Sequence, residues 1–385
     1  IGSYFLISSE NPWPGYLAIF PVLGSFLLIQ ANRNNSIITN NFIFQKLGTW
    51  SYSIYLWHWP IVVAIYMYSL DYKYSYLGVG LSILLGFISY KYVERFKFKN
   101  NFKSYIQYLS FKPLYMVIVI SVIGASSFYS NGFDYRVSEN VRIKNINAIK
   151  AINDWSYPEP NFTIGDSDVR LIKGSSDKNI LFIGASHVEQ TYPYVEYLNS
   201  EYNVYYLTKG GCFITPSYVH PKWSCENIQN YKPIISSVKF DKIVSSSYLL
   251  TSHLPLDEPT KSNELKNRVS EYKDFLEFAK ANSNEVFIIL GEPTGREFDP
   301  KLSVRHNLRS FITKKEAKDN YKDQYEVLND ITNIGGVEVI DPIEHLCDDI
   351  CMTMDTDFQF YYKDSTHMRP WYARKSLGYL DVIFR

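Results

Sequence analysis

The sequence lacks an excess of charge of either sign, because 39 Lys and Arg residues balance 39 Asp and Glu residues over 385 positions. No domain-wide basic face or RNA-binding signature accompanies the many aromatic residues, which argues against a nucleic-acid-binding protein. Disorder and a small disulfide-stabilised module are also excluded, because 46% of the residues are hydrophobic and the chain is long enough to bury a sizeable core.

Acidic residues are scarce in the first third of the chain. Residues 1–129 hold 3 Asp and Glu against 9 Lys and Arg, whereas residues 130–385 hold 36 against 30. Nearly charge-free stretches of about 16–19 residues, close to the roughly 20 that cross a bilayer core, lie at Tyr16–Ala31, Tyr52–Leu70, Tyr76–Tyr92 and Leu114–Tyr129. We expect four membrane spans; buried helices of a soluble protein are the alternative.

Basic residues predict the orientation of these spans. Between the third and fourth span lie Lys91, Arg95, Lys97, Lys99, Lys103 and Lys112. Cationic loops stay in the cytoplasm, so this loop and the segment Arg33–Lys46 are expected inside and the C-terminal part outside. The chain begins with Ile1 rather than Met, and we expect it to be a fragment with further spans upstream.

The run Trp50–Ile61 is unusual because it places His58 and Pro60 inside an apolar span. A functional histidine and an imidazole hydrogen-bonded among neighbouring helices are both compatible with the pattern. Over residues 14–95 the sequence resembles the membrane acyltransferase-3 family, in which such a Tyr-Ser-x-Tyr-Leu-x-His-x-Pro segment lies in a late transmembrane helix. The His and Arg residues of early helices to which that family's acyl-donor chemistry is attributed have no counterpart here.

The exported part has an alternating pattern. Residues 131–178 are polar with little periodicity and are expected to form a linker. Short β-rich runs follow at Ile180–Ile183, Val204–Leu207, Lys242–Ser246, Val286–Leu290 and Val337–Ile340. Helix-like stretches lie between or after them at Val188–Leu198, Asn227–Val238, Asn263–Asn282, Lys314–Ile334 and Trp371–Ile383. This alternation predicts an α/β three-layer domain around a parallel sheet of about five strands.

The four cysteines fall into two local pairs, Cys212 with Cys225 and Cys347 with Cys351. All lie in the part expected outside the membrane, where disulfides form. Pairing by proximity is the simplest of the three connectivities. A zinc site is the competing interpretation, with His220 and His345 as the nearby imidazoles.

The sharpest chemical motif is the apolar strand that ends in Gly184-Ala185-Ser186-His187 and runs into a helix. A serine on such a turn presents its hydroxyl at the sheet edge, where backbone N–H groups face developing negative charge. Helix N-capping is the alternative role for Ser186.

The motif Asp364-Ser-Thr-His367 near the C-terminus contains a candidate general base, His367. The carboxylate is placed to fix the tautomer of His367, whose other nitrogen would accept the proton of Ser186. Together the two motifs resemble the SGNH (GDSL-like) hydrolase fold over residues 179–385. The resemblance implies Ser186 as nucleophile, His367 as general base and acid, and Asp364 as its orienting partner.

The oxyanion donors are less clearly marked. The SGNH resemblance implies a backbone N–H of Ser186 and of Gly211 or Gly210, although a glycine turn leading into a disulfide explains these glycines equally well. The usual Gly-Asp-Ser is Gly-Ala-Ser here. The third block normally carries an Asn, but the corresponding strand end reads Ser245-Ser-Ser-Tyr-Leu249. Ser246 or Ser247 is expected to substitute.

Further residues are expected near the site. Candidate substrate-binding residues are His187, Ser247 and Tyr248, with a bond to a helix-start carbonyl as the alternative for His187. His253 and His306 are expected at the surface or in loops. The Gly291–Gly295 turn is expected at the same sheet edge, where lining of the site and a plain turn are both compatible with the sequence. Sugar stacking and core packing both account for the aromatic residues Tyr248, Tyr361, Tyr362 and Trp371.

The order of parts resembles bacterial transferases that O-acetylate cell-surface polysaccharides. It implies a partial acyltransferase-3 domain with three spans over 1–112, a linking transmembrane helix over 113–130, a linker over 131–178 and an exported SGNH domain over 179–385. The expected protein is a multi-pass inner-membrane acyltransferase with a periplasmic C-terminal domain. No cofactor or metal is expected to be bound. The expected donor of the acyl group is acyl-CoA, with acetyl-CoA as the expected form.

The expected acceptor is a polysaccharide, such as lipopolysaccharide O-antigen, or a lipid-linked oligosaccharide. A carbohydrate esterase and a catalytically silent glycan-binding domain remain the alternatives, since the same triad hands an acyl group to water or to a sugar.

Overall fold

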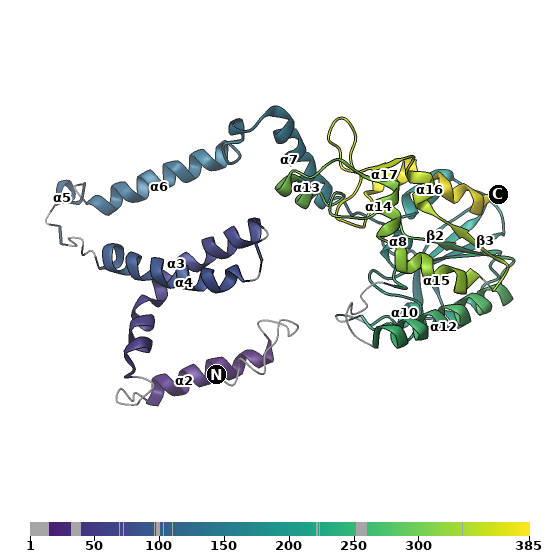
Figure 1. Ribbon diagram of the computed structural model, residues 1–385, viewed down its shortest axis with the longest axis horizontal. Helices are drawn as coiled ribbons and strands as arrows, with labels where there is room; N and C mark the ends of the chain where they lie inside the picture. The colour runs from purple at the N-terminus through teal and green to yellow at the C-terminus, as the bar shows by residue number, and fades with distance from the viewer. Residues whose placement is uncertain are drawn as a thin grey trace. The chain divides into compact units, whose positions relative to one another are not determined.

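The computed structural model describes residues 15–31, 40–68, 70, 71, 73–95, 97, 101, 102, 104–109, 111–220, 222, 224–251, 260–332 and 334–385. Outside these described residues lie Ile1, Arg33, Lys99, Lys103 and His253, on which some of the expectations above rest. The chain divides into two compact units, Ile1–Gly132 and Phe133–Arg385 (Figure 1). Each unit is described by itself.

The first unit is helical. Its helices are η1 Tyr16–Ala18, α2 Ile19–Ala31, α3 Phe42–Met67, α4 Tyr74–Ser89, the π-helical turn η2 Tyr90–Glu94, α5 Tyr105–Leu109 and α6 Lys112–Tyr129. Among the described residues, two helices are long and apolar enough to cross a membrane, Tyr74–Glu94 and Lys112–Tyr129, and Tyr16–Ala31 is a shorter apolar helix. The predicted span Tyr52–Leu70 falls largely within α3, and the number of spans stays a prediction.

Small residues let α3 and α4 pack closely. A Cβ on Gly86 would lie 2.5 Å from Cγ1 of Ile54, and one on Gly78 would lie 2.9 Å from Cδ1 of Ile65. Close approach at small residues is typical of helices that associate in lipid. His58 Nδ1 contacts the Tyr55 carbonyl oxygen of its own helix, and the role of this histidine stays a prediction.

The second unit is built on a mixed sheet. Within the described residues seven strands join in the order β1-β2-β4-β3-β5-β6-β8. The strands are β1 Phe162–Ile164, β2 Ser167–Ile172, β3 Asn179–Gly184, β4 Asn203–Thr208, β5 Lys242–Ser246, β6 Glu285–Ile289 and β8 Val337–Ile340. The last five pair in parallel, which confirms the predicted strands. Their carboxyl ends therefore meet at one edge. A separate antiparallel pair consists of β7 Phe311–Thr313 and β9 Ile350–Met352.

Helices cover both faces of this sheet (Figure 1). The helices of the second unit as a whole are α7 Glu139–Ile152, α8 Ser186–Glu189, α9 Tyr192–Leu198, α10 Glu226–Gln229, α11 Tyr231–Ser237, α12 Thr260–Ala281, α13 Pro300–His306, α14 Lys314–Asp319, α15 Lys322–Thr332, α16 Pro342–Leu346 and α17 Pro370–Ser376, with the 3-10 turns η3 Asp134–Arg136 and η4 Gly378–Phe384. Successive side chains of β3 enter opposite cores. Leu181 and Ile183 pack in the cluster that includes α12, whereas Ile180 and Phe182 pack in the cluster that includes α9, α17 and η4. Burial on both faces explains why these strands read as continuous apolar runs.

The expectation of an irregular linker over residues 131–178 is wrong. Helix α7 lies in this segment and packs through Ala148 and Ala151 against Met354 and Phe360. Strands β1 and β2 also lie there: β2 pairs antiparallel with β4, and β1 pairs antiparallel with β2 as the edge strand of the main sheet. The sheet is therefore mixed rather than purely parallel, and its domain begins before residue 179.

Several expected helices are interrupted. The stretch Val188–Leu198 consists of α8 and α9, and Lys314–Ile334 consists of α14 and α15. The terminal stretch ends in the 3-10 turn η4 after α17. Pro193 and Pro370 lie in the first turns of α9 and α17, where the missing N–H of proline is tolerated.

Candidate active site

The nucleophile turn follows β3 directly. Gly184 has φ +154°, and a Cβ there would lie 2.7 Å from Cγ2 of Val188, so glycine is needed between strand and helix. Ala185 is the N-cap of the single-turn helix α8, and Ser186 is the first helical residue. Ser186 is therefore not the N-cap, which removes that alternative, and its hydroxyl has a different partner.

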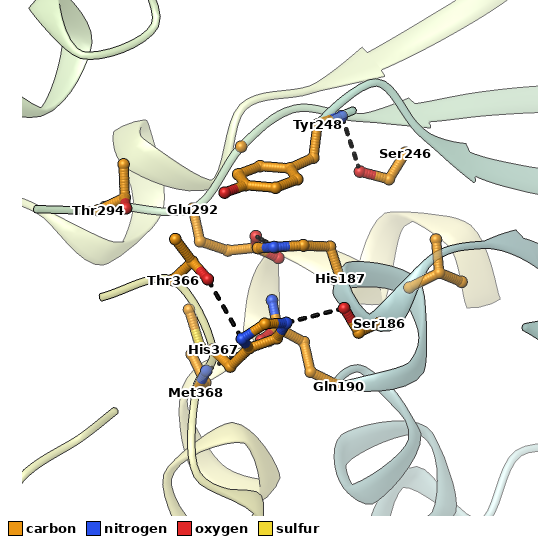
Figure 2. Close-up of polar contacts among 12 residues, drawn as sticks. Ser186, His187, Gln190, Ser246, Tyr248, Glu292, Thr294, Thr366, His367 and Met368 are labelled. Atoms are coloured by element: carbon orange, nitrogen blue, oxygen red, sulfur yellow. Dashed lines mark hydrogen bonds and ion pairs between the residues drawn. The ribbon is translucent and has the colours of Figure 1, made fainter. Parts of the chain in front are cut away.

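Ser186, His367 and Asp364 form a continuous hydrogen-bonded chain. Ser186 Oγ lies 2.7 Å from Nε2 of His367 (Figure 2). Nδ1 of His367 lies 3.0 Å from both carboxylate oxygens of Asp364. The sequence-predicted triad therefore comes together with hydroxyl, base and carboxylate in the order that general-base activation of a serine requires.

The carboxylate of Asp364 is held by its own turn. Backbone N–H groups of Thr366 and His367 donate to Oδ1, each at 2.9 Å. Burial acts to raise the pKa of Asp364, but the hydrogen bond and charge interaction with His367, aided by these N–H donors, hold the pKa well below its ordinary value. Asp364 is therefore ionised at neutral pH and fixes the Nδ1–H tautomer of His367.

Two contacts tie the His367 loop to the rest of the site. Oε1 of Gln190, just after α8, accepts a hydrogen bond of 2.9 Å from the Met368 N–H. Arg369 pairs with Asp154 at 2.8 Å and donates to the Phe360 carbonyl oxygen at 2.9 Å. The loop that carries the base is thereby connected both to the nucleophile helix and to the segment after α7.

Aromatic and imidazole rings surround the base. The His187 ring stacks between those of Tyr248 and His367, with centroid distances of 3.5 Å and 4.9 Å (Figure 2). Trp155 approaches His367 nearly perpendicularly at 5.0 Å. Burial raises the pKa of Tyr248 to about 12, while a hydrogen bond with Thr366 acts to lower it.

Two expected substrate contacts are buried instead. His187 is 3% exposed and its Nδ1 lies 3.2 Å from Oε2 of Glu292. Ser247 is 1% exposed, and its carbonyl oxygen accepts a hydrogen bond from Gln324. Their burial argues against direct contact of either side chain with a substrate. Tyr248 remains half-buried at the strand end.

The loops expected to supply oxyanion donors begin beside the nucleophile turn. Gly184 pairs with Thr208 in register, and the Lys209 N–H donates to the Gly184 carbonyl oxygen at 3.1 Å. Gly210 and Gly211 follow this contact, and Gly211 has φ +71°. Ser246 ends β5 and its hydroxyl accepts from the Tyr248 N–H at 3.2 Å. Donation to an oxyanion by these groups stays a prediction.

The remaining aromatic candidates have structural partners. Tyr361 stacks on Tyr372 at 4.0 Å, and Tyr362 is buried against Phe298. Trp371 has the Lys375 ammonium 4.3 Å from its ring centroid. These contacts favour the core-packing interpretation, most clearly for Tyr362.

Disulfides join Cys212 to Cys225 and Cys347 to Cys351, as proximity predicts. All four sulfurs are thereby used, so no cysteine thiolate is left for the alternative zinc site.

Three contacting residues were missed by the sequence analysis: Trp155, Gln190 and Arg369. Trp155 and Asp154 lie in the stretch interpreted as a linker, whereas Glu292 lies in the Gly291–Gly295 turn, for which lining of the site was one of two interpretations. The available signal for Glu292 was its place after a buried strand at the sheet edge that carries the site.

Comparisons with known proteins identify the family of the second unit. Residues 155–376 match the family of SGNH domains fused to AT3 domains. No curated protein matches the sequence significantly. The chain is also similar to the solved structure of the periplasmic domain of the lipopolysaccharide acetyltransferase of Salmonella ser. Paratyphi A, with 14% identity, a TM-score of 0.39, and coverage of 55% of this chain and 85% of that chain. Because the family match spans more than half of the sequence, the chain belongs to the family of SGNH domains that are fused to AT3 domains.

Proposed function

We propose that the chain is an O-acyltransferase that modifies a bacterial cell-surface polysaccharide. The expected product is lipopolysaccharide O-antigen that carries an O-acetyl group. The observation that carries this proposal is the hydrogen-bonded chain Ser186–His367–Asp364 in an SGNH domain of the AT3-fused family. Family membership supports transfer, because a plain esterase needs no associated membrane acyltransferase.

The proposed reaction has two acyl-transfer steps. Ser186 Oγ attacks the carbonyl carbon of the donor acyl group as Nε2 of His367 takes the hydroxyl proton. The leaving group departs with that proton and leaves an acyl ester on Ser186. A sugar hydroxyl then attacks this ester, gives its proton to Nε2 of His367, and Ser186 recovers a proton as the acylated sugar leaves.

Each side chain has a defined part in these steps. Asp364 stays ionised and stabilises the imidazolium that His367 becomes in both steps. Backbone N–H groups of Ser186 and of Gly210 or Gly211 are the proposed oxyanion donors. Loss of one such donor, as in the absence of the Asn that is usual in SGNH hydrolases, typically lowers the rate by about 10²–10³-fold.

The donor and location form part of the same proposal. An acyl group from cytoplasmic acyl-CoA would reach Ser186 through the membrane part, and the second unit would lie in the periplasm. The apolar helices Tyr74–Glu94 and Lys112–Tyr129 and the two disulfides are compatible with this arrangement.

A carbohydrate esterase is the second candidate. The side chains of His367 and Asp364 are 25% and 37% exposed, so water has access to the base and its carboxylate. The intact hydrogen-bonded triad argues against a catalytically silent glycan-binding domain.

The test uses the full chain in detergent, with p-nitrophenyl acetate as donor and bacterial-type oligosaccharides as acceptors, read by mass spectrometry. Acetylated sugar that disappears in Ser186→Ala is the expected result. Acetate alone, with the same dependence, would establish an esterase. Turnover that is equal in Ser186→Ala and wild type would refute the triad. The matched control is Ser237→Ala, which removes a hydroxyl that donates to the Ile234 carbonyl oxygen in α11.

A further inference from the structure

A buried acid–imidazole pair lies beside the triad and takes no part in the steps above. Glu292 and His187 are 1% and 3% exposed, and Oε2 of the former lies 3.2 Å from Nδ1 of the latter. Burying a carboxylate is unfavourable unless hydrogen bonds replace its hydration. Because this buried pair lies next to the candidate triad, we expect it to play a part in the chemistry of the triad.

Glu292 is held from several directions in the segment that follows β6. Tyr379 OH donates to Oε1 at 3.4 Å, and Tyr321 OH donates to the Glu292 carbonyl oxygen at 2.8 Å. The preceding Gly291 N–H donates to Oε1 of Gln324 at 3.2 Å. Both the backbone and the carboxylate are therefore fixed, and the side chain is aimed at His187 (Figure 2).

His187 transmits this position to the base. Its ring lies nearly parallel to that of His367, at an interplanar angle of 30°, and the Tyr248 ring covers its other face (Figure 2). The Tyr248 phenol hydrogen-bonds with Thr366, whose hydroxyl lies 3.2 Å from Nδ1 of His367. One end of the stack is therefore His367 itself, and the other end, Tyr248, is hydrogen-bonded to Thr366 of the same turn.

We propose that Glu292 and His187 are positioning residues for the base: the Glu292 carboxylate accepts Nδ1–H of His187 and holds an electron-rich neutral imidazole face against His367. This arrangement stabilises the imidazolium that His367 becomes when it takes the Ser186 proton. The inference rests on the proposed function, because it assigns His367 as the base. No proton moves between His187 and Glu292 in the reaction.

The charges around the stack support this assignment. Burial lowers the pKa of His187 more strongly than Glu292 raises it, so the ring stays neutral. His367 is also within the field of Asp364 and of Glu189 on α8. Glu189 is balanced by Arg170 at 2.7 Å. The hydrogen-bond partners that the structure gives the Glu292 carboxylate are His187 and Tyr379, and burial holds the pKa of Tyr379 well above its usual value.

Other titratable groups face the same cluster. Tyr248, Tyr321 and Tyr362 all lie within the electrostatic influence of Glu292, and burial raises the pKa of each, so they remain neutral. On the His367 turn, the Lys363 ammonium lies over Trp155. Arg369 is paired with Asp154. Among the described residues Glu292 pairs with His187 and forms no ion pair with Lys or Arg, so Glu292→Gln removes the charge without breaking a pair with a Lys or Arg side chain.

The test is the pH profile of kcat/KM for p-nitrophenyl acetate with the full chain between pH 5 and 9. In Glu292→Gln we expect the plateau to fall about 3–10-fold, and the acid limb to move down by about half to one pH unit, because loss of a negative charge disfavours the imidazolium. The matched control is Asp381→Asn, whose carboxylate accepts from Tyr194 OH at 2.6 Å, and it should keep the wild-type profile.

The outcomes separate the two proposals. A lower plateau with an unmoved acid limb would mean a structural role only, and a wild-type profile would mean no role; either overturns the inference. Turnover that survives Ser186→Ala would instead overturn the proposed function. Thermal unfolding of each variant reports whether the chain is folded.

A measurement on the wild-type chain keeps the inference testable if Glu292→Gln does not fold. In a ¹⁵N-histidine-labelled full chain, the His187 signals should show a proton on Nδ1, none on Nε2, and no titration between pH 5 and 8. Titration near the ordinary value of 6.5, or a proton on Nε2, would refute the inference.

Discussion

The indole of Trp155 lies against the imidazole of His367, with ring centroids 5.0 Å apart and an interplanar angle of 74°. The Lys363 ammonium lies 4.9 Å from the centroid of the same indole. Asp154 precedes Trp155 and pairs with Arg369 beyond His367. The segment after α7 therefore forms part of the surroundings of His367 in the candidate active site.

Replacing Trp155 by Ala should lower Ser186-dependent turnover of p-nitrophenyl acetate by about 3–10-fold, because aromatic contacts of this kind contribute about 0.5–1.5 kcal/mol. Trp155→Phe should retain most of the rate, since a ring still contacts His367. Tyr197→Ala is the control, as this side chain is 66% exposed. Equal rates for Trp155→Ala and wild type would show that the contact does not orient the base.

Replacing Asp364 by Asn should lower kcat by about 10²–10⁴-fold with little change in folding. In the wild-type chain the Thr366 and His367 N–H groups donate to Oδ1 of Asp364, and the side-chain oxygen of Asn can accept the same two hydrogen bonds. Its NH₂ would face Nδ1 and impose the wrong tautomer on His367. Steady-state kinetics and thermal unfolding test this expectation, and a variant within threefold of wild type would contradict the assigned role.

Arg369→Met should lower the free energy of unfolding by about 1.5–3 kcal/mol, because it removes hydrogen bonds of a buried cation to Asp154 and to the Phe360 carbonyl oxygen. Denaturant unfolding measures the loss. A double-mutant cycle with Asp154→Asn should give a coupling energy above about 0.5 kcal/mol. Additive effects of the two changes would contradict a direct interaction.

Removing the Cys212–Cys225 disulfide with a double Ala substitution should lower the free energy of unfolding by about 2–4 kcal/mol. Removing Cys347–Cys351 should have a smaller effect, because its sequence separation is 4 rather than 13 residues and it restricts the unfolded chain less. Denaturant unfolding of both variants tests the order. The reverse order would show that native contacts of these loops outweigh chain entropy.

Stability should decline as the pH falls below 6.5, in part through His187. Burial lowers its pKa in the folded chain, so the unfolded chain binds the proton first, and the free energy of unfolding falls between 6.5 and the folded pKa. Thermal unfolding at pH 7.5 and 5.0 measures this dependence. It should be weaker in His187→Gln, and an unchanged dependence would place its origin in other groups.

Much of the site could be predicted because its chemistry is local in sequence. The serine follows an apolar strand that can be recognised without knowledge of its neighbours, and Asp364 and His367 lie on one short turn. Parallel pairing then brings the strand ends to one edge. The structure also confirms the five parallel strands and both cysteine pairs. These could be predicted because the strands are hydrophobic runs and the paired cysteines are close together in the sequence.

The sequence by itself determined the candidate triad residues and the positions of the five parallel strands in the chain, because short-range patterns specify them. Only the tertiary structure decided that β2 joins the sheet antiparallel to β4, that Trp155 reaches His367, and that Glu292 is buried against His187. These features come from polar stretches without periodicity. Their conformation depends on which distant surface covers them, and that choice is made by packing over the whole domain.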